Sequence, residues 1–350
     1  MQSPVLAVRA DAGREIGHGH FLRGLTLARA WQSRGYEAVF ITACRTPALL
    51  DRLRTAGVAV LDVTDAHPAS QDLEVTLGWV SEHPEAWLVL DGYHFDASYQ
   101  RAVKDGGARL LVIDDHDHAD HYCANVLLNQ NLFTERLAYS SEPFTRRLFG
   151  PRYALIRPEF RVAAVQGRDI APVARRLLVT LGGADPSNQT LKVLEALRAI
   201  EARDLDVRVV GGADNPHAAT LTQAARAGGA RSVLYGVDDM AALMAWADLA
   251  VSAAGSTCWE MACMGLPAVL LVLAENQRRI AEGLAEVGAA VNLGWCGAVD
   301  AGAITAAVGG LIGNRDRRQE MSAQARALVD GGGCDRVLAA LGREVLSGAL

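Results

Sequence analysis

Residues 5–31 read VLAVRADAGREIGHGHFLRGLTLARAW and contain an apolar run, a glycine-rich turn and a helical pattern in succession. The run at residues 5–10 is mostly apolar and has the length of a buried parallel strand. Apolar side chains then recur at helical spacing, at Phe21, Leu22, Leu25, Ala28 and Trp31. This order predicts an α/β domain, in which ligands bind beyond the carboxyl ends of the strands.

The turn at residues 11–23, DAGREIGHGHFLR, combines an Asp, three Gly and two His. It lacks both the G-x-G-x-x-G spacing of a dinucleotide site and the G-x-x-x-x-G-K-[ST] pattern of a P-loop, so it predicts neither NAD nor ATP binding. His20 falls at or near the start of the helix, where unpaired N–H groups and the helix dipole favour an anion. A flexible turn with solvated histidines is the structural alternative.

The composition indicates a soluble globular protein. The chain has 350 residues and is 50% hydrophobic, which is enough for two domains with a large core. Its net charge of −6 argues against nucleic-acid binding, because that function needs a basic surface. The six cysteines are scattered, so we expect reduced thiols in a cytoplasmic protein. We expect no membrane insertion, since no signal segment or apolar run of spanning length is visible. We also expect a monomer.

Strand-like and helical segments alternate along the whole chain, which predicts two Rossmann-like α/β domains facing across a cleft. Residues 1–150 form the first domain, with later strands expected at 38–42, 58–61, 87–90 and 110–113. Three prolines mark residues 151–172 as a linker, and residues 173–350 form the second domain. Its strands are expected at 177–181, 207–210, 232–235, 249–252 and 268–273. Helical patterns at 319–329 and 335–346 follow, and the sequence leaves open whether the last helix returns to the first domain.

Two loops of the second domain have the composition of phosphate or sugar sites. Residues 182–190, GGADPSNQT, lie between a strand and a helix, and Ser187 or Asn188 is expected to cap that helix. Gly255, Ser256 and Thr257 precede another helix, so their N–H and hydroxyl groups are suited to a diphosphate. Pure helix capping is the alternative for both loops. One helical turn later, Glu260 is suited to accept both hydrogens of a ribose diol, and the polar pair Asn276 and Gln277 follows the next strand.

Seven motifs occur together in one order. They are RADAGREIGHGHFLR (9–23), VLDGY (89–93), VIDD (112–115), NVLLNQN (125–131), YALIRPEF (153–160), LGGADPSNQT (181–190) and the block 255–277. On these motifs the chain resembles the GT-B-like hydrolases of pseudaminic acid biosynthesis, which act on UDP-2,4-diacetamido-2,4,6-trideoxy-β-L-altropyranose. The block 255–277 is also similar to that of the undecaprenyl-linked N-acetylglucosaminyltransferases of peptidoglycan synthesis.

The resemblance implies that water attacks the anomeric carbon with inversion and that UDP leaves, without a metal or other cofactor. Matched motif to motif, the family's base is His20, while the additional His18 leaves open which imidazole acts. UDP is a good leaving group, so one base suffices where an ordinary glycosidase needs an acid as well. A helix N-terminus disfavours a charged imidazole, which suits a base.

Further polar residues and glycines are expected to contact the sugar. They are Asp11, Gly17, Gly19, Arg23, Asp91, Tyr93, Asp115, Arg157, Gly183, Asp185 and Asn188. Arg157 has the alternative of pairing with Glu159. The run DDHDHADH at 114–121 has metal-ligating residue types, but we expect no functional metal there, because a neutral base and a helix dipole suffice. A glycosyltransferase that uses a UDP-sugar donor and a non-catalytic nucleotide-sugar binder are the alternative functions.

Overall fold

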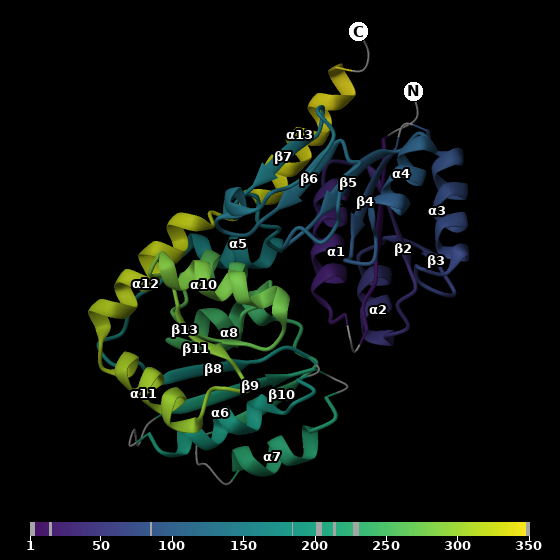
Figure 1. Ribbon diagram of the computed structural model, residues 1–350. Helices are drawn as coiled ribbons and strands as arrows, with labels where there is room; N and C mark the ends of the chain where they lie inside the picture. The colour runs from purple at the N-terminus through teal and green to yellow at the C-terminus, as the bar shows by residue number, and fades with distance from the viewer. Residues whose placement is uncertain are drawn as a thin grey trace. The chain divides into compact units, whose positions relative to one another are not determined.

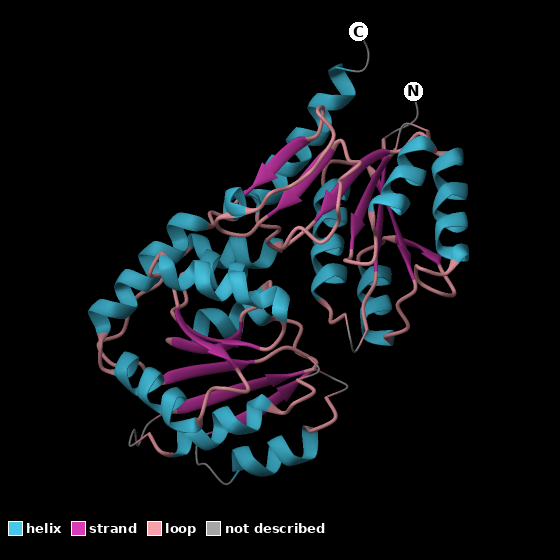
Figure 2. Ribbon diagram, viewed as in Figure 1, coloured by secondary structure: helices cyan, strands magenta, loops and turns pink. Residues whose placement is uncertain are grey.

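The computed structural model describes residues 4–13, 16–84, 86–183, 185–200, 205–212, 215–226 and 231–347. The chain divides into two compact units, Met1–Leu155 with Gly332–Leu350, and Ile156–Gly331. Each unit is a parallel sheet with helices packed on it (Figures 1 and 2). Within the described residues, no helix combines the length and apolar character that crossing a bilayer requires.

The first unit has a seven-stranded sheet in the order β3-β2-β1-β4-β5-β6-β7. Its strands are β1 (Val5–Ala10), β2 (Glu37–Thr42), β3 (Ala59–Asp62), β4 (Trp87–Asp91), β5 (Arg109–Ile113), β6 (Val126–Asn129) and β7 (Arg146–Phe149). Its helices are α1 (Gly19–Gln32), α2 (Pro47–Thr55), α3 (Ser70–Glu82), α4 (Ala97–Asp105) and α13 (Gly333–Ser347), with short 3₁₀ turns at Thr134–Arg136 and Pro151–Tyr153. The strand order reverses between β1 and β4, and such a reversal is where open α/β sheets bind ligands.

The second unit repeats this arrangement with a six-stranded sheet in the order β10-β9-β8-β11-β12-β13. Its strands are β8 (Arg176–Thr180), β9 (Asp206–Gly211), β10 (Arg231–Tyr235), β11 (Leu249–Ala253), β12 (Ala268–Val272) and β13 (Val291–Trp295). Its helices are α5 (Pro158–Val165), α6 (Gln189–Arg198), α7 (Ala218–Arg226), α8 (Met240–Trp246), α9 (Thr257–Met264), α10 (Arg278–Glu286), α11 (Ala301–Ile312) and α12 (Arg315–Leu328), with a 3₁₀ turn at Glu275–Gln277. The nine later strands expected from sequence are confirmed to within one residue at each end, whereas β6, β7 and β13 were not expected.

The unit boundaries differ from the expected domains at two places. Residues 151–172 are not a free linker, because Phe160 of α5 is fully buried and the Arg168 guanidinium donates to the carbonyl oxygen of Met264 at 3.1 Å. The C-terminal helix α13 belongs to the first unit, where its buried Val337 and Leu341 join the core that α1 also lines (Figure 1). The apolar face of α13 therefore decides where the end of the chain packs.

Close packing fixes α1 against the sheet. A Cβ atom on Gly24 would lie 2.7 Å from Cγ1 of Val8, so only a glycine lets the helix approach β1 this closely. Phe21 of α1 is buried against Phe40 of β2, with ring centroids 4.6 Å apart. Because both contacts lie in the first two turns, they also hold the polar side chains at the start of α1.

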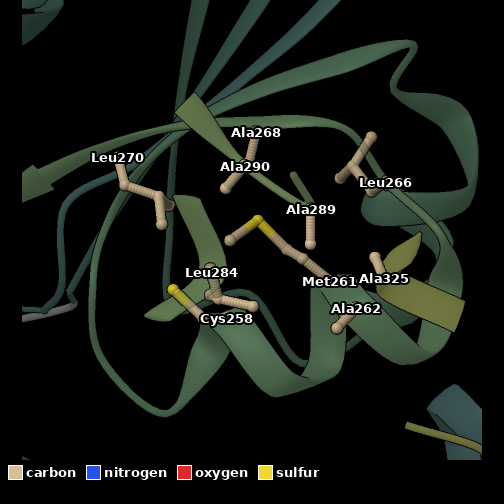
Figure 3. A pocket seen from close by; sticks show the side chains of 10 residues that line it. All are labelled: Cys258, Met261, Ala262, Leu266, Ala268, Leu270, Leu284, Ala289, Ala290 and Ala325. Carbon is tan, nitrogen blue, oxygen red and sulfur yellow. The ribbon is translucent and has the colours of Figure 1, made fainter. Parts of the chain in front are cut away.

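A small apolar cavity underlies α9 in the second unit (Figure 3). Its walls come from α9, β12, α10 and α12, including Met261, Leu270, Leu284 and Ala325. Every lining side chain is apolar or a thiol, so this space belongs to the packing of α9 and offers a polar ligand no hydrogen bond.

Candidate active site

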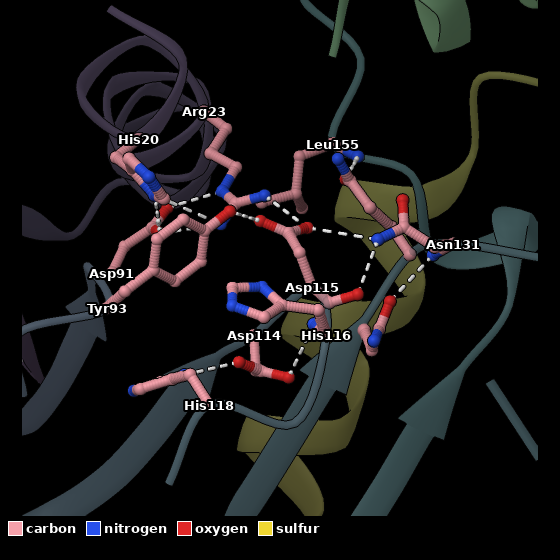
Figure 4. A network of polar contacts seen from close by, with 12 residues as sticks. His20, Arg23, Asp91, Tyr93, Asp114, Asp115, His116, His118, Asn131 and Leu155 are labelled. Atoms are coloured by element: carbon pink, nitrogen blue, oxygen red, sulfur yellow. Dashed lines mark hydrogen bonds and ion pairs between the residues drawn. The ribbon is translucent and has the colours of Figure 1, made fainter. Parts of the chain in front are cut away.

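Three buried side chains meet where β1 and β4 end (Figure 4). Ala10 pairs with Asp91 at the carboxyl ends of these strands, and the turn after β1 leads into α1. His20 Nδ1 lies 2.7 Å from Asp91 Oδ1, while Arg23 Nε donates to Asp91 Oδ2 at 2.6 Å and Arg23 Nη2 to Oδ1 at 2.7 Å. Arg23 stands one turn after His20 on the same helix, so a single carboxylate holds both.

The tautomer of His20 follows from these contacts. A carboxylate only accepts hydrogen bonds, so the short contact between Asp91 and Nδ1 requires a proton on Nδ1. In the neutral ring the lone pair is then on Nε2. Arg23 Nη2 lies 3.2 Å from the same Nδ1 but bonds to Asp91 at 2.7 Å, which leaves the imidazole proton directed to the carboxylate. His20 is therefore oriented as a base that accepts at Nε2.

Asp115 forms the other side of this network. Arg23 Nη1 donates to Asp115 Oδ1 at 2.8 Å, and Tyr93 Oη donates to Asp115 Oδ2 at 2.7 Å. Asn131 Nδ2 also lies 3.2 Å from Asp115 Oδ1. Sequence reasoning missed Asn131 as a site residue, although it ends the quoted motif NVLLNQN, two residues after the end of β6.

Charges within the network fix its ionisation. Burial alone would raise the pKa of Asp91, but Arg23 and His20 hold it below its usual range. The same Arg23 holds the pKa of Asp115 well below its usual range against the effect of burial. Burial would lower the pKa of Arg23, and the two carboxylates raise it well above the ordinary value. Both carboxylates are thus ionised and shared by one guanidinium.

Tyr93 lies between two imidazoles at this edge of the sheet. Its ring meets His20 edge-on, with centroids 4.7 Å apart and planes at 86°, and meets His116 at 4.5 Å and 78°. Since Tyr93 Oη is bonded to Asp115, the ring is held against His20 from one side. Five of the predicted residues, His20, Arg23, Asp91, Tyr93 and Asp115, therefore meet in one place.

Asp11 was expected to contact the sugar, and in the structure its carboxylate binds other protein groups. It pairs with Arg9 at 2.7 Å and accepts the N–H of Ala43 at 2.7 Å, and His94 Nε2 lies 3.4 Å from its second oxygen. Arg9 itself also binds the buried Asp72. Asp11 leads the chain out of β1 and ties β1 to β2, so the structure separates it from the His20 network.

The glycines of the first turn shape the backbone. Gly17 has φ +76° and forms two backbone hydrogen bonds with Gly13, at 3.3 and 2.8 Å. Gly19 is the first residue of α1, and His18 occupies the N-cap position. Arg14 and Glu15 lie outside the described residues. The pairing of Gly13 with Gly17 therefore lies directly before the N-cap of α1. A contact of Gly17 or Gly19 with a sugar stays a prediction.

The run DDHDHADH divides between two networks. Asp115 belongs to the His20 network, whereas Asp114 accepts the backbone N–H groups of His116 and Asp117 and binds the side chains of His118 and Tyr139. The first two carboxylates thus have protein partners. Burial alone would lower the pKa of His118, but Asp114 raises it above the ordinary 6.5.

The His118 pair predicts a pH dependence of stability. A raised pKa means that the stabilisation by protonated His118 is complete below pH 6.5 and is lost as the pH rises through the folded-state pKa. We expect this loss to amount to about 1.5–3 kcal/mol, the usual range for a hydrogen bond to a charged group, and to be absent in His118→Asn. Urea unfolding of both proteins from pH 6 upward, with the difference between them plotted, measures it. A difference that does not change with pH contradicts the assignment.

In the second unit, the residues expected to bind UDP lie around the start of α9. Ser256 is the N-cap and Thr257 the first residue of this helix. A Cβ atom on Gly255 would find Gln277 Nε2 as its nearest described neighbour, at 3.9 Å. Gln277 Oε1 accepts the N–H of Leu273 at 2.9 Å, which fixes the amide so that Nε2 points toward the glycine. The glycine therefore leaves an open backbone face beside an oriented amide donor.

Glu260 and Arg157 meet within the second unit. Arg157 Nε donates to Glu260 Oε1 at 2.8 Å, and Arg157 Nη1 lies 3.3 Å from Glu159 Oε1. Burial would lower the pKa of Arg157, but Glu260 raises it. The alternative pairing with Glu159 is thus present, yet the shorter contact is with Glu260, whose carboxylate is held in place one turn into α9. Asn276 belongs to the 3₁₀ turn that also contains Gln277.

The loop 182–190 corrects the expected helix cap. Asn188 occupies the N-cap position of α6 in a left-handed conformation, φ +51°, and the helix takes its cap from Asp185 instead. The Asp185 carboxylate accepts the N–H groups of Gln189 and Thr190, both at 2.8 Å. Gly183 O accepts the N–H of Gly212 at 3.1 Å. Asp185 is buried and both of its carboxylate oxygens accept helix N–H groups, so few of its lone pairs are left for a sugar hydroxyl. Ala184 lies outside the described residues.

This cap predicts a stability loss. Asp185→Ala leaves the N–H groups of Gln189 and Thr190 without their acceptor, and we expect a loss of about 1–2 kcal/mol in the free energy of unfolding. Ser187→Ala, at an exposed position of the same loop, is the control and should change it by less than about 0.5 kcal/mol. If urea denaturation showed the same loss of unfolding free energy for Asp185→Ala and Ser187→Ala, Asp185 would not be the cap of α6.

Residues 176–330 match the family model described as glycosyltransferase family 28 C-terminal domain. The chain is 26% identical over 338 residues to the spore coat polysaccharide biosynthesis protein SpsG of Bacillus subtilis, covering 96% of this chain and 97% of that protein. It is 23% identical over 283 residues to the UDP-2,4-diacetamido-2,4,6-trideoxy-β-L-altropyranose hydrolase of Campylobacter jejuni, covering 80% and 96%.

Among solved structures, MurG of Acinetobacter baumannii superposes with a TM-score of 0.68 at 16% identity, over 98% of this chain and all of that one. At this identity the likeness concerns the fold alone. Residues 176–330 are thus similar to the glycosyltransferase family 28 C-terminal domain, and the chain has the fold of two Rossmann-like domains that is found in GT-B glycosyltransferases.

Proposed function

We propose that this protein is a UDP-sugar hydrolase in which His20 activates the attacking water. The observation that carries the proposal is the orientation of His20 by Asp91 at 2.7 Å, at the point where the strand order of the first sheet reverses. Similarity along most of the chain to a hydrolase of a UDP-diacetamido sugar supports this reaction class. We take UDP-2,4-diacetamido-2,4,6-trideoxy-β-L-altropyranose as the substrate and pseudaminic acid biosynthesis as the pathway.

The second unit is proposed to hold UDP. The start of α9 offers the N–H groups of Ser256 and Thr257 to the diphosphate, together with the positive end of the helix dipole. Gln277 Nε2 donates beside Gly255, which has no side chain to exclude a phosphate oxygen. Glu260, held by Arg157, accepts the hydrogens of the ribose diol.

The first unit is proposed to carry the chemistry. His20 Nε2 accepts a proton from water while the water oxygen forms a bond to the anomeric carbon. The bond between that carbon and the diphosphate oxygen breaks, and its electron pair leaves with UDP. Asp91 stabilises the imidazolium that forms, as a positioning residue that keeps the proton on Nδ1. Attack opposite to the leaving group inverts the anomeric configuration.

No acid is needed in this scheme. The pKa of a nucleoside diphosphate is low enough for it to leave unprotonated when N–H dipoles face its charge. The polar groups around His20, especially Tyr93, Asp115 and Asn131, are proposed to bind the sugar substituents. They are held by mutual hydrogen bonds of 2.7–3.2 Å, so this side of the site is ordered before the substrate binds.

Sugar transfer is the second candidate, because residues 176–330 match a glycosyltransferase domain. The same His20 would then take the proton of a sugar or lipid hydroxyl in place of water. The two functions differ in one requirement, which is whether UDP release needs an added acceptor.

A time course of NMR spectra in ¹⁸O-labelled water tests the proposal. With the synthetic UDP-sugar alone, we expect UDP release, one ¹⁸O atom on the anomeric carbon, and initial appearance of the inverted anomer. Label in UDP would show cleavage of the bond between phosphorus and oxygen and would overturn the mechanism. Release only after addition of an acceptor would favour the transferase.

A further inference from the structure

His121, Cys123 and Glu142 form a cluster of three metal-ligating side chains apart from His20, Arg23 and Asp91. One ligand atom from each lies within 4.8 Å of the others. All three belong to the first unit, between β5 and β7. His121 is the last residue of the run DDHDHADH. The first two residues of that run, Asp114 and Asp115, bind other protein groups and do not belong to this cluster.

Backbone pairing explains why these side chains share one face. Tyr122 pairs with Ser141 in a parallel bridge; its N–H donates to Ser140 O at 2.9 Å, and the Glu142 N–H donates to Tyr122 O at 3.3 Å. Side chains alternate between the faces of paired strands. The residues on either side of Tyr122 and of Ser141 therefore point to one common face. They are His121, Cys123, Ser140 and Glu142.

The imidazole is already oriented in the way that metal-binding histidines usually are. His121 Nδ1 lies 2.8 Å from Ser140 Oγ, and Nε2 lies 3.4 Å from Glu142 Oε1. A ligating histidine commonly uses its second ring nitrogen for a hydrogen bond that fixes the ring. The contact with Ser140 leaves Nε2 facing the carboxylate, on the side where a cation would sit.

Helix α4 covers the thiol side of the cluster. Cys123 is buried, its Sγ lies 3.9 Å from Ala97 O, and its N–H donates to Gln100 Oε1 at 3.1 Å. One turn after Ala97, Arg101 Nη2 binds Glu142 Oε1 at 2.9 Å. A guanidinium thus supplies positive charge at the carboxylate that would ligate the metal.

We propose that His121 Nε2, Cys123 Sγ and a Glu142 carboxylate oxygen bind one zinc ion, with water in the fourth position. Zinc holds nitrogen, sulfur and oxygen ligands at about 2.0–2.3 Å, so its ligands lie about 3.3–3.8 Å apart, a small contraction of this cluster. Binding forms a bond between zinc and sulfur and releases the thiol proton to solvent. The ion joins the segment around Tyr122 to that around Ser141 and is independent of the proposed hydrolysis.

Zinc binding to the chelator-stripped full chain tests this site. We expect one zinc per chain by equilibrium dialysis, and with cobalt as a probe an intense near-ultraviolet band from thiolate bound to the metal. Cys123→Ser should abolish that band, and His121→Gln, at a partly exposed side chain, should lower the affinity more than about 100-fold. Cys44→Ser, at another buried thiol of the first unit, is the control and should leave the cobalt band and the zinc affinity unchanged.

Two further variants separate a built site from fortuitous binding. Ser140→Ala removes the hydrogen bond that orients His121, and we expect a loss of about 10–100-fold in zinc affinity. Arg101→Gln removes the cation that competes for Glu142 and should tighten binding. Absence of stoichiometric binding at micromolar zinc, or the same affinity in Cys123→Ser and His121→Gln as in the wild type, overturns the proposal.

Discussion

His20→Asn is expected to lower the rate of UDP release by roughly 10²–10⁴-fold, the usual contribution of a general base. The Asn amide keeps a donor for Asp91, so the buried carboxylate retains a partner at the position where Nδ1 now lies 2.7 Å away. What the variant loses is the lone pair on Nε2. The effect should therefore fall on kcat at saturating UDP-sugar, while UDP binding, proposed for the second unit, stays unchanged.

His18→Asn is the control for this variant, because it changes the other imidazole of the same turn. His18 occupies the N-cap position of α1, whereas His20 is the ring that Asp91 orients. We expect His18→Asn to keep the rate within a few-fold of the wild type. Loss of activity in His18→Asn with retention in His20→Asn would exchange their roles. Retention in both variants would exclude water activation by this turn.

Much of the fold could be predicted because it depends on local pattern. Alternating apolar runs and helical spacing predicted β1, α1 and most later strands, since buried parallel strands need continuous apolar segments. The strands that were missed are β6, β7 and β13. Strand β6 is four residues long, and β13 is only partly buried, so neither produces a long apolar run.

The composition of the His20 network could be predicted only in part. The position of His20 follows from local sequence, because a glycine-rich turn leads directly into α1. Its partners depend on strand order instead: Asp91 is 71 residues away, and Asp115 is 92 residues from Arg23. Only the placement of β4 beside β1, with β5 next to it, brings these carboxylates to one guanidinium. Asp11, which is local to the turn, binds Arg9 and the N–H of Ala43, and its expected contact with the sugar stays a prediction.

The cap of α6 was predicted wrongly, and the place of α13 was left open, for a similar reason. Ser187 and Asn188 stand where a cap usually stands, but the left-handed backbone at Asn188 presents the helix N-terminus to Asp185. The position of α13 depends on which unit offers a complementary apolar face. Sequence periodicity shows that such a face exists, but it does not identify the partner.

Arg23→Met is expected to lower the free energy of unfolding of the first unit by about 3–5 kcal/mol. Removing one partner of a buried ion pair leaves an uncompensated charge, which costs about that much. Here the side chains of Asp91 and Asp115 are 0% and 8% exposed, and both lose the guanidinium that now binds them at 2.6–2.8 Å. Hydrogen exchange of the β1 and β4 amides reports the unfolding of this unit.

Arg45→Met is the matched control, since Arg45 and Asp62 form an ion pair in the same unit whose side chains are 53% and 64% exposed. Its loss should cost about 0–1 kcal/mol. Adding Asp115→Asn to Arg23→Met should recover part of the stability, because it removes one unpaired charge. A loss no greater than that of Arg45→Met would contradict the buried pairing. The measured loss would show how strongly folding depends on the guanidinium that also holds Asp91 against His20.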